Sequence, residues 1–208
     1  MRLSKQFFYI FLFICTLSQA GSTGANLPSA KPMAALKKAF EHAKKMNVVK
    51  SSIVTLVDYS LPSNKPRLWV IDMVNQKVIK QTTVAHGKYS GWVLPTSFSN
   101  AMGSLKSSIG VFVTGSVYQG KHGQSMRLIG LESGFNDKAA ERGIVVHGAN
   151  YVHEQCFGDH GLCTGRSFGC PAVATNEIKD IIKHTASGSL WVSYYPDQHW
   201  LSKSRFLV

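Results

Sequence analysis

Short runs of β-branched and aromatic residues, each closed by Gly, Pro, Asn or Ser, recur along the chain from residue 52 onward. Runs of this length and composition are typical of β-strands. Only two segments, 32–47 and 175–183, place apolar residues at a clear helical spacing. The sequence therefore predicts a mainly β domain with an N-terminal helix over 32–47 and one C-terminal helix. The strands are expected at 52–58, 67–74, 77–85, 108–114, 126–131, just before residue 147, and at 189–195.

The N-terminus has the features of an export signal. It carries the basic residues Arg2 and Lys5, an apolar run over 7–17 and a small residue at Ala20. This order is typical of a secretory signal peptide. The run is short for a membrane span, which needs about 20 apolar residues, although an uncleaved anchor stays open. We expect a signal peptide over 1–20 and a periplasmic or otherwise secreted location in the cell envelope.

Length and composition predict the remaining domain organisation. The chain has 208 residues, and 44% of them are hydrophobic, which suffices for one domain with a sizeable core. Residues 21–31 are rich in Gly, Ser, Ala and Pro and are interpreted as a flexible lead-in. A single domain is then expected over 32–208, and we expect it to be a monomer.

Basic residues outnumber acidic ones by 23 to 11, which gives a formal net charge of +12. Such a charge favours polyanionic surroundings. Nucleic acid is not expected as a partner, because no basic run with interleaved aromatic residues occurs and the chain carries an export signal. An anionic cell wall fits both features, and the lysines of segment 32–47 suit a loose association with the wall or a membrane surface. A charge kept only for solubility is the alternative.

A glycine-rich segment connects a strand-like run that ends at His147 with a cysteine, Cys170. A thiol needs a neighbouring base or a positive field to become the attacking thiolate, and His147 can be that base. A backbone carbonyl such as that of Gly148 can hold the imidazole in one tautomer. Backbone amides near Phe168 and Gly169 can form an oxyanion hole. The alternative is a buried structural thiol beside a core histidine.

The residues around this pair carry a resemblance to a known family. The motif consists of His147-Gly148 followed by Ser167-Phe168-Gly169-Cys170-Pro171-Ala172. It resembles the signature of the murein L,D-transpeptidase catalytic-domain family, and the likeness covers about residues 86–195. The resemblance implies a mixed β-sandwich, Cys170 as nucleophile, His147 as general base and no cofactor. It makes 32–208 a single catalytic domain.

In the family, the cysteine is acylated by a peptidoglycan stem peptide with release of a terminal D-alanine, and an amine of a second stem resolves the thioester. The chain departs from the commoner family pattern at two positions. Phe168 stands where a second histidine is usual, and Ala172 stands where an asparagine is usual. The base role then falls on His147 alone. The gap between His147 and Ser167 is also longer than usual, which indicates an enlarged loop.

Further residues are candidates for binding the stem peptide. The glycine-containing turn at residues 118–123 carries a phenol, an ammonium group and an imidazole, which can bind carboxylate or amide groups of a peptide. A solvated hairpin tip is the alternative for this turn, and a surface loop residue is the alternative for His86. The substrate-binding candidates are Tyr118, Lys121, His122, His86, Arg166 and Ser167.

The cysteines that remain after export leave several readings open. An odd number of cysteines outside the cytoplasm suggests one disulfide and one free thiol. Cys156 and Cys163 can form that disulfide and leave Cys170 reactive, or both can stay free. A minor alternative is a zinc site with ligands of suitable type but unusual spacing. Its ligands are His153, Cys156, His160 and Cys163.

Three functions therefore stay open. The first is an exported cysteine acyltransferase acting on peptidoglycan stems. The second is an L,D-carboxypeptidase, in which water replaces the acceptor amine, because acceptor choice depends on groove shape and water exclusion. The third is a non-catalytic wall-binding module. This possibility arises because Phe168 and Ala172 differ from the commoner family pattern.

Overall fold

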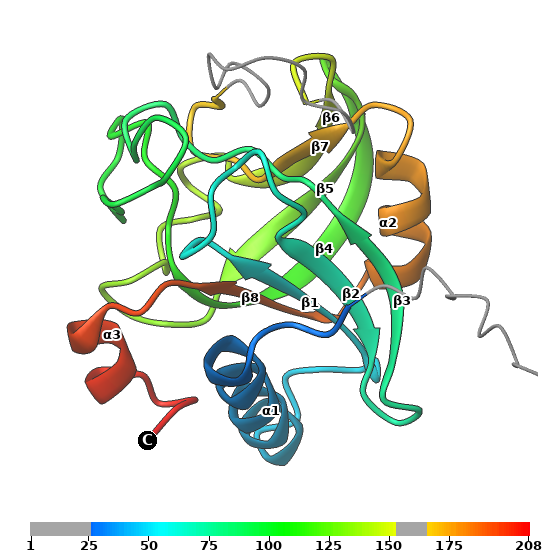
Figure 1. Ribbon diagram of the computed structural model, residues 1–208, viewed down its shortest axis with the longest axis vertical. Coiled ribbons are helices and arrows are strands. Elements are labelled where there is room, and N and C mark those ends of the chain that lie inside the picture. The colour runs from blue at the N-terminus through cyan, green and yellow to red at the C-terminus, as the bar shows by residue number, and fades with distance from the viewer. Residues whose placement is uncertain (1–25, 153–165) are drawn as a thin grey trace, which may run out of the picture.

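A single eight-stranded mixed sheet forms the framework of the protein (Figure 1). The computed structural model describes residues 26–152 and 166–208. The strand order is β3-β2-β1-β8-β4-β5-β6-β7, in which β1–β8 and β6–β7 are parallel and the other neighbours antiparallel. The strands are β1 Ile53–Asp58, β2 Leu68–Asp72, β3 Lys77–Thr82, β4 Gly110–Gly120, β5 Gly123–Gly130, β6 Val145–Ala149, β7 Ala172–Ala174 and β8 Leu190–Tyr194. The expected mainly β, mixed architecture is confirmed.

The N-terminal helix covers one face of the sheet. Helix α1, Ala30–Lys45, buries Leu36, Ala39, Phe40 and Ala43 against β1 and β8. These residues recur at helical spacing, so they form one apolar stripe, while the lysines between them face solvent. The helix begins at Ala30, which shortens the lead-in expected over 21–31.

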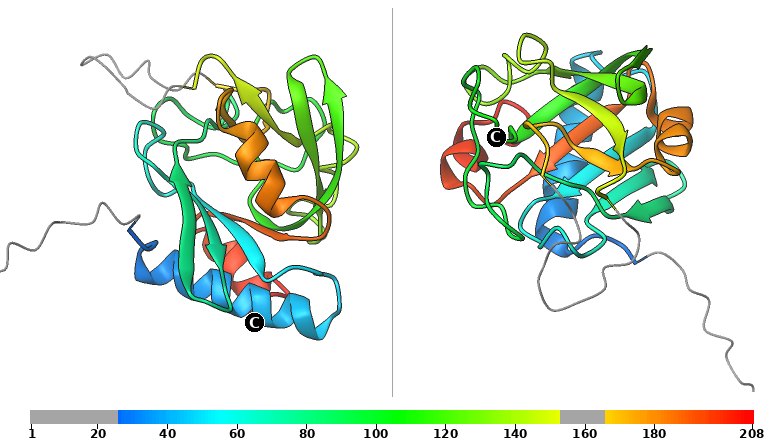
Figure 2. Two further views of the ribbon diagram at one scale, coloured as in Figure 1. Left: turned by 90° about the vertical axis from the view of Figure 1, so that its right-hand side faces the viewer. Right: turned by 90° about the horizontal axis from the view of Figure 1, so that it is seen from above.

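The opposite face of the sheet holds a second core. Helix α2, Ile178–Thr185, buries Ile178, Ile181 and Ile182. It contacts β1 and β2 at one end of the sheet and β5 and β6 at the other, so the sheet curves around it (Figure 2). Through this curvature, strands from both halves of the sheet pack against the same helix.

The C-terminal region contains two features that the sequence does not predict. Strand β8, the last strand in the chain, lies centrally between β1 and β4. The tail forms α3, Gln198–Lys203, so two helices follow the glycine-rich segment instead of the one expected. The side chain of Trp200 is fully buried and donates to the Glu132 carboxylate over 3.0 Å. This indole anchors α3. A helix of six residues is too short for apolar spacing in the sequence to predict it.

Some expectations lie outside the described residues. The signal peptide over 1–20 is one, and the segment with Cys156 and Cys163 is another. Within residues 26–152 and 166–208, none of the helices has the length and apolar character to span a membrane.

Candidate active site

Two neighbouring parallel strands bring His147 and Cys170 to the same edge of the sheet. In the pairing of β6 with β7, His147 lies opposite Ala172. Cys170 precedes Ala172 by two residues, so it lies level with Val145 of β6. The Cys170 Sγ is 3.5 Å from the Val145 N–H nitrogen and 3.6 Å from the Gly143 carbonyl oxygen. The thiol is therefore held against the start of β6, on the strand that carries the imidazole.

Both side chains line one cavity of about 690 Å³. None of the described residues in its wall is Asp or Glu, so the wall is cationic and aromatic. Such a surface favours ligands that carry carboxylates. Besides His147 and Cys170, its charged and aromatic residues are Tyr118, Lys121, His122, Arg142, Tyr151, Arg166 and Phe168.

The imidazole of His147 is held in one tautomer. Its Nδ1 lies 2.9 Å from the carbonyl oxygen of Gly148, which has no proton to give, so Nδ1–H is the donor. Nε2 is then left with its lone pair and can accept a proton. Burial lowers the pKa of His147, and the charges of His122 and Lys121 lower it further, whereas the Gly148 contact raises it. The resting imidazole is therefore neutral around pH 7.

The Cys170 side chain is a free thiol. Burial raises its pKa, while the Val145 amide and the charges of Arg142 and Lys121 oppose that effect. A raised thiol pKa beside a lowered imidazole pKa means that the resting pair is neutral. The thiolate then forms by proton transfer during attack, which makes a general base necessary.

The loop that carries Cys170 is held by its own serine. The Ser167 hydroxyl donates to the Cys170 carbonyl over 2.5 Å and accepts from the Gly169 N–H over 3.1 Å. The Ser167 hydroxyl therefore holds the loop, and it also engages the Gly169 amide.

Glycine is required at position 169 by the backbone conformation and by a close neighbour. Its φ of 123° is a conformation that residues with a Cβ rarely adopt. A Cβ there would also lie 2.9 Å from the Lys106 carbonyl oxygen. Among the described residues, none accepts a hydrogen bond from the Cys170 N–H. That amide is therefore a candidate donor to a bound ligand.

The L,D-transpeptidase catalytic-domain family model matches residues 28–194. The chain belongs to this family. No curated protein matches it. Similar solved structures include an L,D-transpeptidase from Mycobacterium smegmatis, with 12% identity, coverage of 70% of this chain and 59% of that one, and a TM-score of 0.44. Another is an L,D-transpeptidase from Stackebrandtia nassauensis, with 15% identity, coverage of 82% and 69%, and a TM-score of 0.39.

The chain thus spans less than two thirds of the M. smegmatis protein. Because these TM-scores are below 0.5, the family assignment rests on the match to residues 28–194.

The rim of this L,D-transpeptidase domain carries most of the other candidates. Arg166 packs its guanidinium 3.8 Å from the centre of the Trp92 ring. Phe168 is exposed, and the Lys88 ammonium lies 4.7 Å from its ring centre. Tyr118 lies under the Arg127 guanidinium at 4.9 Å. These side chains lie in or beside the cavity wall, where a bound peptide can reach them.

Two cavity residues were missed by the sequence reasoning. Arg142 donates to the carbonyls of Ser99 and Lys106, both over 2.6 Å, and so ties the 90–108 loop to the wall beside Cys170. Tyr151 lies four residues after His147, and burial together with the Cys170 charge raises its pKa to about 12. The closeness of Tyr151 in sequence to His147 and Gly148 could have marked it as a candidate site residue.

His86, a substrate-binding candidate from the sequence, is buried. The side chain has no exposed surface, its Nδ1 accepts from Arg67 over 2.8 Å, and its Nε2 lies 3.3 Å from the Gly91 carbonyl oxygen. Its backbone carbonyl accepts from the Ser167 N–H. His86 therefore stabilises the cysteine loop through its backbone.

This burial predicts an acid-sensitive fold. Desolvation and the Arg67 charge lower the pKa of His86 to about 4, so the unfolded chain binds this proton below about pH 6.5 while the folded chain does not. The stability that His86 contributes is complete above pH 6.5 and falls by about 3 kcal/mol by pH 4. The free energy of unfolding in urea should fall less between pH 7 and pH 4 in His86→Asn than in the wild-type protein. Equal pH differences for both proteins would contradict this.

Proposed function

We propose that this chain is an exported L,D-transpeptidase that transfers peptidoglycan stem peptides through a thioester on Cys170. The observation that carries the proposal is the shared cavity, in which a neutral His147 with a free Nε2 and a free Cys170 thiol face one space. The family assignment of residues 28–194 supports the same chemistry.

In the first half-reaction, His147 Nε2 takes the proton from the Cys170 thiol. The sulfur then forms a bond to the carbonyl carbon of the L-centre before the terminal D-alanine. The negative charge moves to the carbonyl oxygen, where the Cys170 N–H can donate to it. When the carbon–nitrogen bond breaks, the departing D-alanine amine takes the proton from His147, and a thioester remains.

In the second half-reaction, an acceptor amine from a neighbouring stem attacks the thioester carbon. His147 takes one amine proton, the carbon–sulfur bond breaks, and the thiolate recovers the proton from His147. The product is a new amide between two stems. Water in place of the amine would release a free acid, which is the carboxypeptidase outcome.

The cavity wall is suited to a stem peptide in this role. Lys121, Arg142 and Arg166 give it positive charge, and stem peptides carry free carboxylates. Phe168 and Tyr151 add apolar surface for the peptide backbone and methyl groups. We propose that these residues bind the donor stem, with the chain acting in the cell envelope as a monomer.

Product analysis tests the proposal. The chain from residue 21 onward is incubated with a defined tetrapeptide stem, and the products are identified by mass spectrometry. Dimers formed with loss of D-alanine are the expected result. Free tripeptide alone would replace the transferase with a carboxypeptidase, and unchanged substrate would favour the non-catalytic wall-binding module.

A further inference from the structure

A second imidazole lies flat against the proposed base. The rings of His122 and His147 are stacked, with centroids 4.3 Å apart and planes inclined by 21°. His122 comes from the two-residue turn between β4 and β5, and its side chain is exposed. Ser125 of β5 pairs with His147 of β6, so the strand pairing brings this turn back over β6.

The stack limits the freedom of the base. A histidine ring can rotate broadly about its χ2 torsion, and the contact of Nδ1 with Gly148 fixes one edge of the His147 ring. A flat ring against its face prevents tilting about that contact. Only 4% of the surface of His147 is exposed, so His122 also keeps water from that face.

The stack also couples two charges. A positive charge on one imidazole disfavours a positive charge on the other at this separation. The charge of Lys121, from the same turn, also acts on His147. Further titratable groups line the cavity with it: Tyr118 from β4, Arg142 before β6, Tyr151 after β6, and Arg166 and Cys170 from the cysteine loop.

We propose that His122 is a positioning residue for the base: its ring fixes the plane of His147, and its charge sets the pH at which His147 works. The inference rests on the proposed function only in naming His147 as the base. His122 thereby supplies a second imidazole at the site from a different strand pair, although Phe168 occupies the usual place of one.

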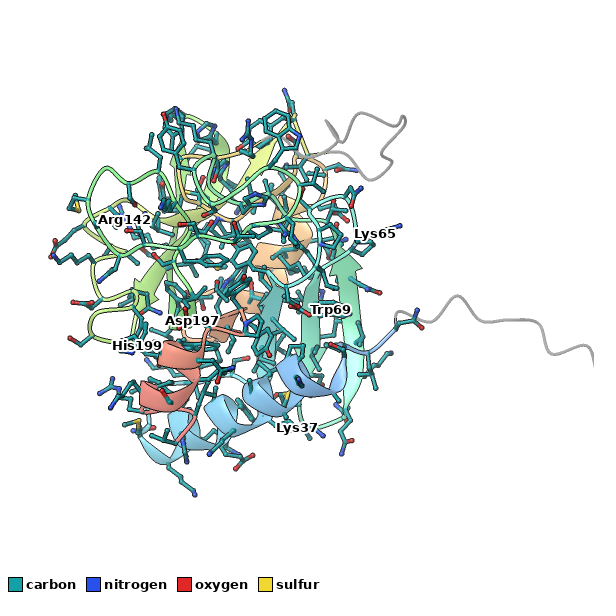
Figure 3. All side chains as sticks on the ribbon, turned by 60° about the vertical axis from the view of Figure 1, so that its left-hand side comes forward. Lys37, Lys65, Trp69, Arg142, Asp197 and His199 are labelled. Carbon is teal, nitrogen blue, oxygen red and sulfur yellow. The ribbon has the colours of Figure 1, made fainter. Side chains whose placement is uncertain are left out.

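Two substitutions separate the ring from the charge. His122→Phe keeps a flat ring and removes the charge, whereas His122→Ala removes both. Because the residue is exposed in a turn, both variants are expected to fold. His199→Phe is the matched control, since His199 also contacts an aromatic ring, that of Phe135 at 5.3 Å. His199 belongs to α3, apart from the cavity residue Arg142 (Figure 3).

Two measurements are made on each variant. The first is the titration of the His147 ring protons by NMR without substrate, where the pKa of His147 should rise in His122→Phe and stay unchanged in His199→Phe. The second is turnover of the stem peptide. His122→Ala should lose about tenfold in kcat with little change in KM, because a displaced base loses rate, and His122→Phe should recover most of that loss at high pH.

The outcomes distinguish this inference from the proposed function. An unchanged titration of His147 in His122→Phe would overturn the coupling. Equal losses in both variants, expressed in KM, would overturn the positioning role and make His122 a substrate ligand. A rise in the pKa of His147 in His122→Phe, together with a wild-type protein that does not turn over stem peptides, would support the coupling and overturn only the proposed function.

Discussion

Cys170→Ala is expected to abolish both D-alanine release from a tetrapeptide stem and covalent acylation by a carbapenem, the inhibitor class that the family resemblance implies. Alanine has no nucleophilic atom, so no thioester can form, and the loss should exceed about 1,000-fold. Mass spectrometry of the intact protein measures the acyl adduct, and chromatography of the peptide measures D-alanine.

The same variant provides a check on the fold. The Cys170 side chain contributes only weak contacts to the Val145 amide and the Gly143 carbonyl, so the variant should keep its circular dichroism spectrum. An alanine variant that folds and still gains the mass of the carbapenem would show that another residue is the nucleophile.

His147→Asn should lower kcat by about 1,000-fold, the middle of the range for a general base. The asparagine amide can still donate to the Gly148 carbonyl, but no titrating nitrogen faces the thiol. Since the resting thiol is neutral, it then lacks a proton acceptor. The rate should also become first order in hydroxide where the wild type is pH-independent, which a pH profile of kcat/KM measures.

Alkylation of the thiol gives an independent check on the base. Iodoacetamide should react with Cys170 more slowly in His147→Asn at pH 7, and Gln124→Ala, outside the cavity wall, serves as the control. A loss of less than tenfold in kcat, with unchanged alkylation, would assign the base role to another group.

Most of the framework could be predicted from the sequence because its signals are local. The β2–β3 hairpin and the apolar stripe of α1 follow from residue patterns within a few turns. The central place of β8 could not be predicted, because it depends on the parallel pairing with β1, more than 130 residues earlier. The anchoring of α3 by Trp200 likewise depends on Glu132, which is distant in sequence.

The candidate site divides in the same way. The contact of His147 with Gly148 joins neighbouring residues, and the sequence suggested it. The burial of His86 depends on its contact with Arg67, which lies 19 residues earlier, just before β2, so the pattern around His86 gave no sign of burial. The stacking of His122 on His147 required the register of β5 against β6, which spacing alone does not determine.

Phe168 stands out in the cysteine loop because 66% of its surface is exposed, while the residues on either side of it are locked in place. Ser167 and Gly169 hold the loop through hydroxyl and main-chain contacts that do not involve the side chain at 168. Side-chain identity there is uncoupled from the geometry of the nucleophile. If the proposed function holds, substitutions at position 168 can alter peptide preference while leaving the sulfur in place.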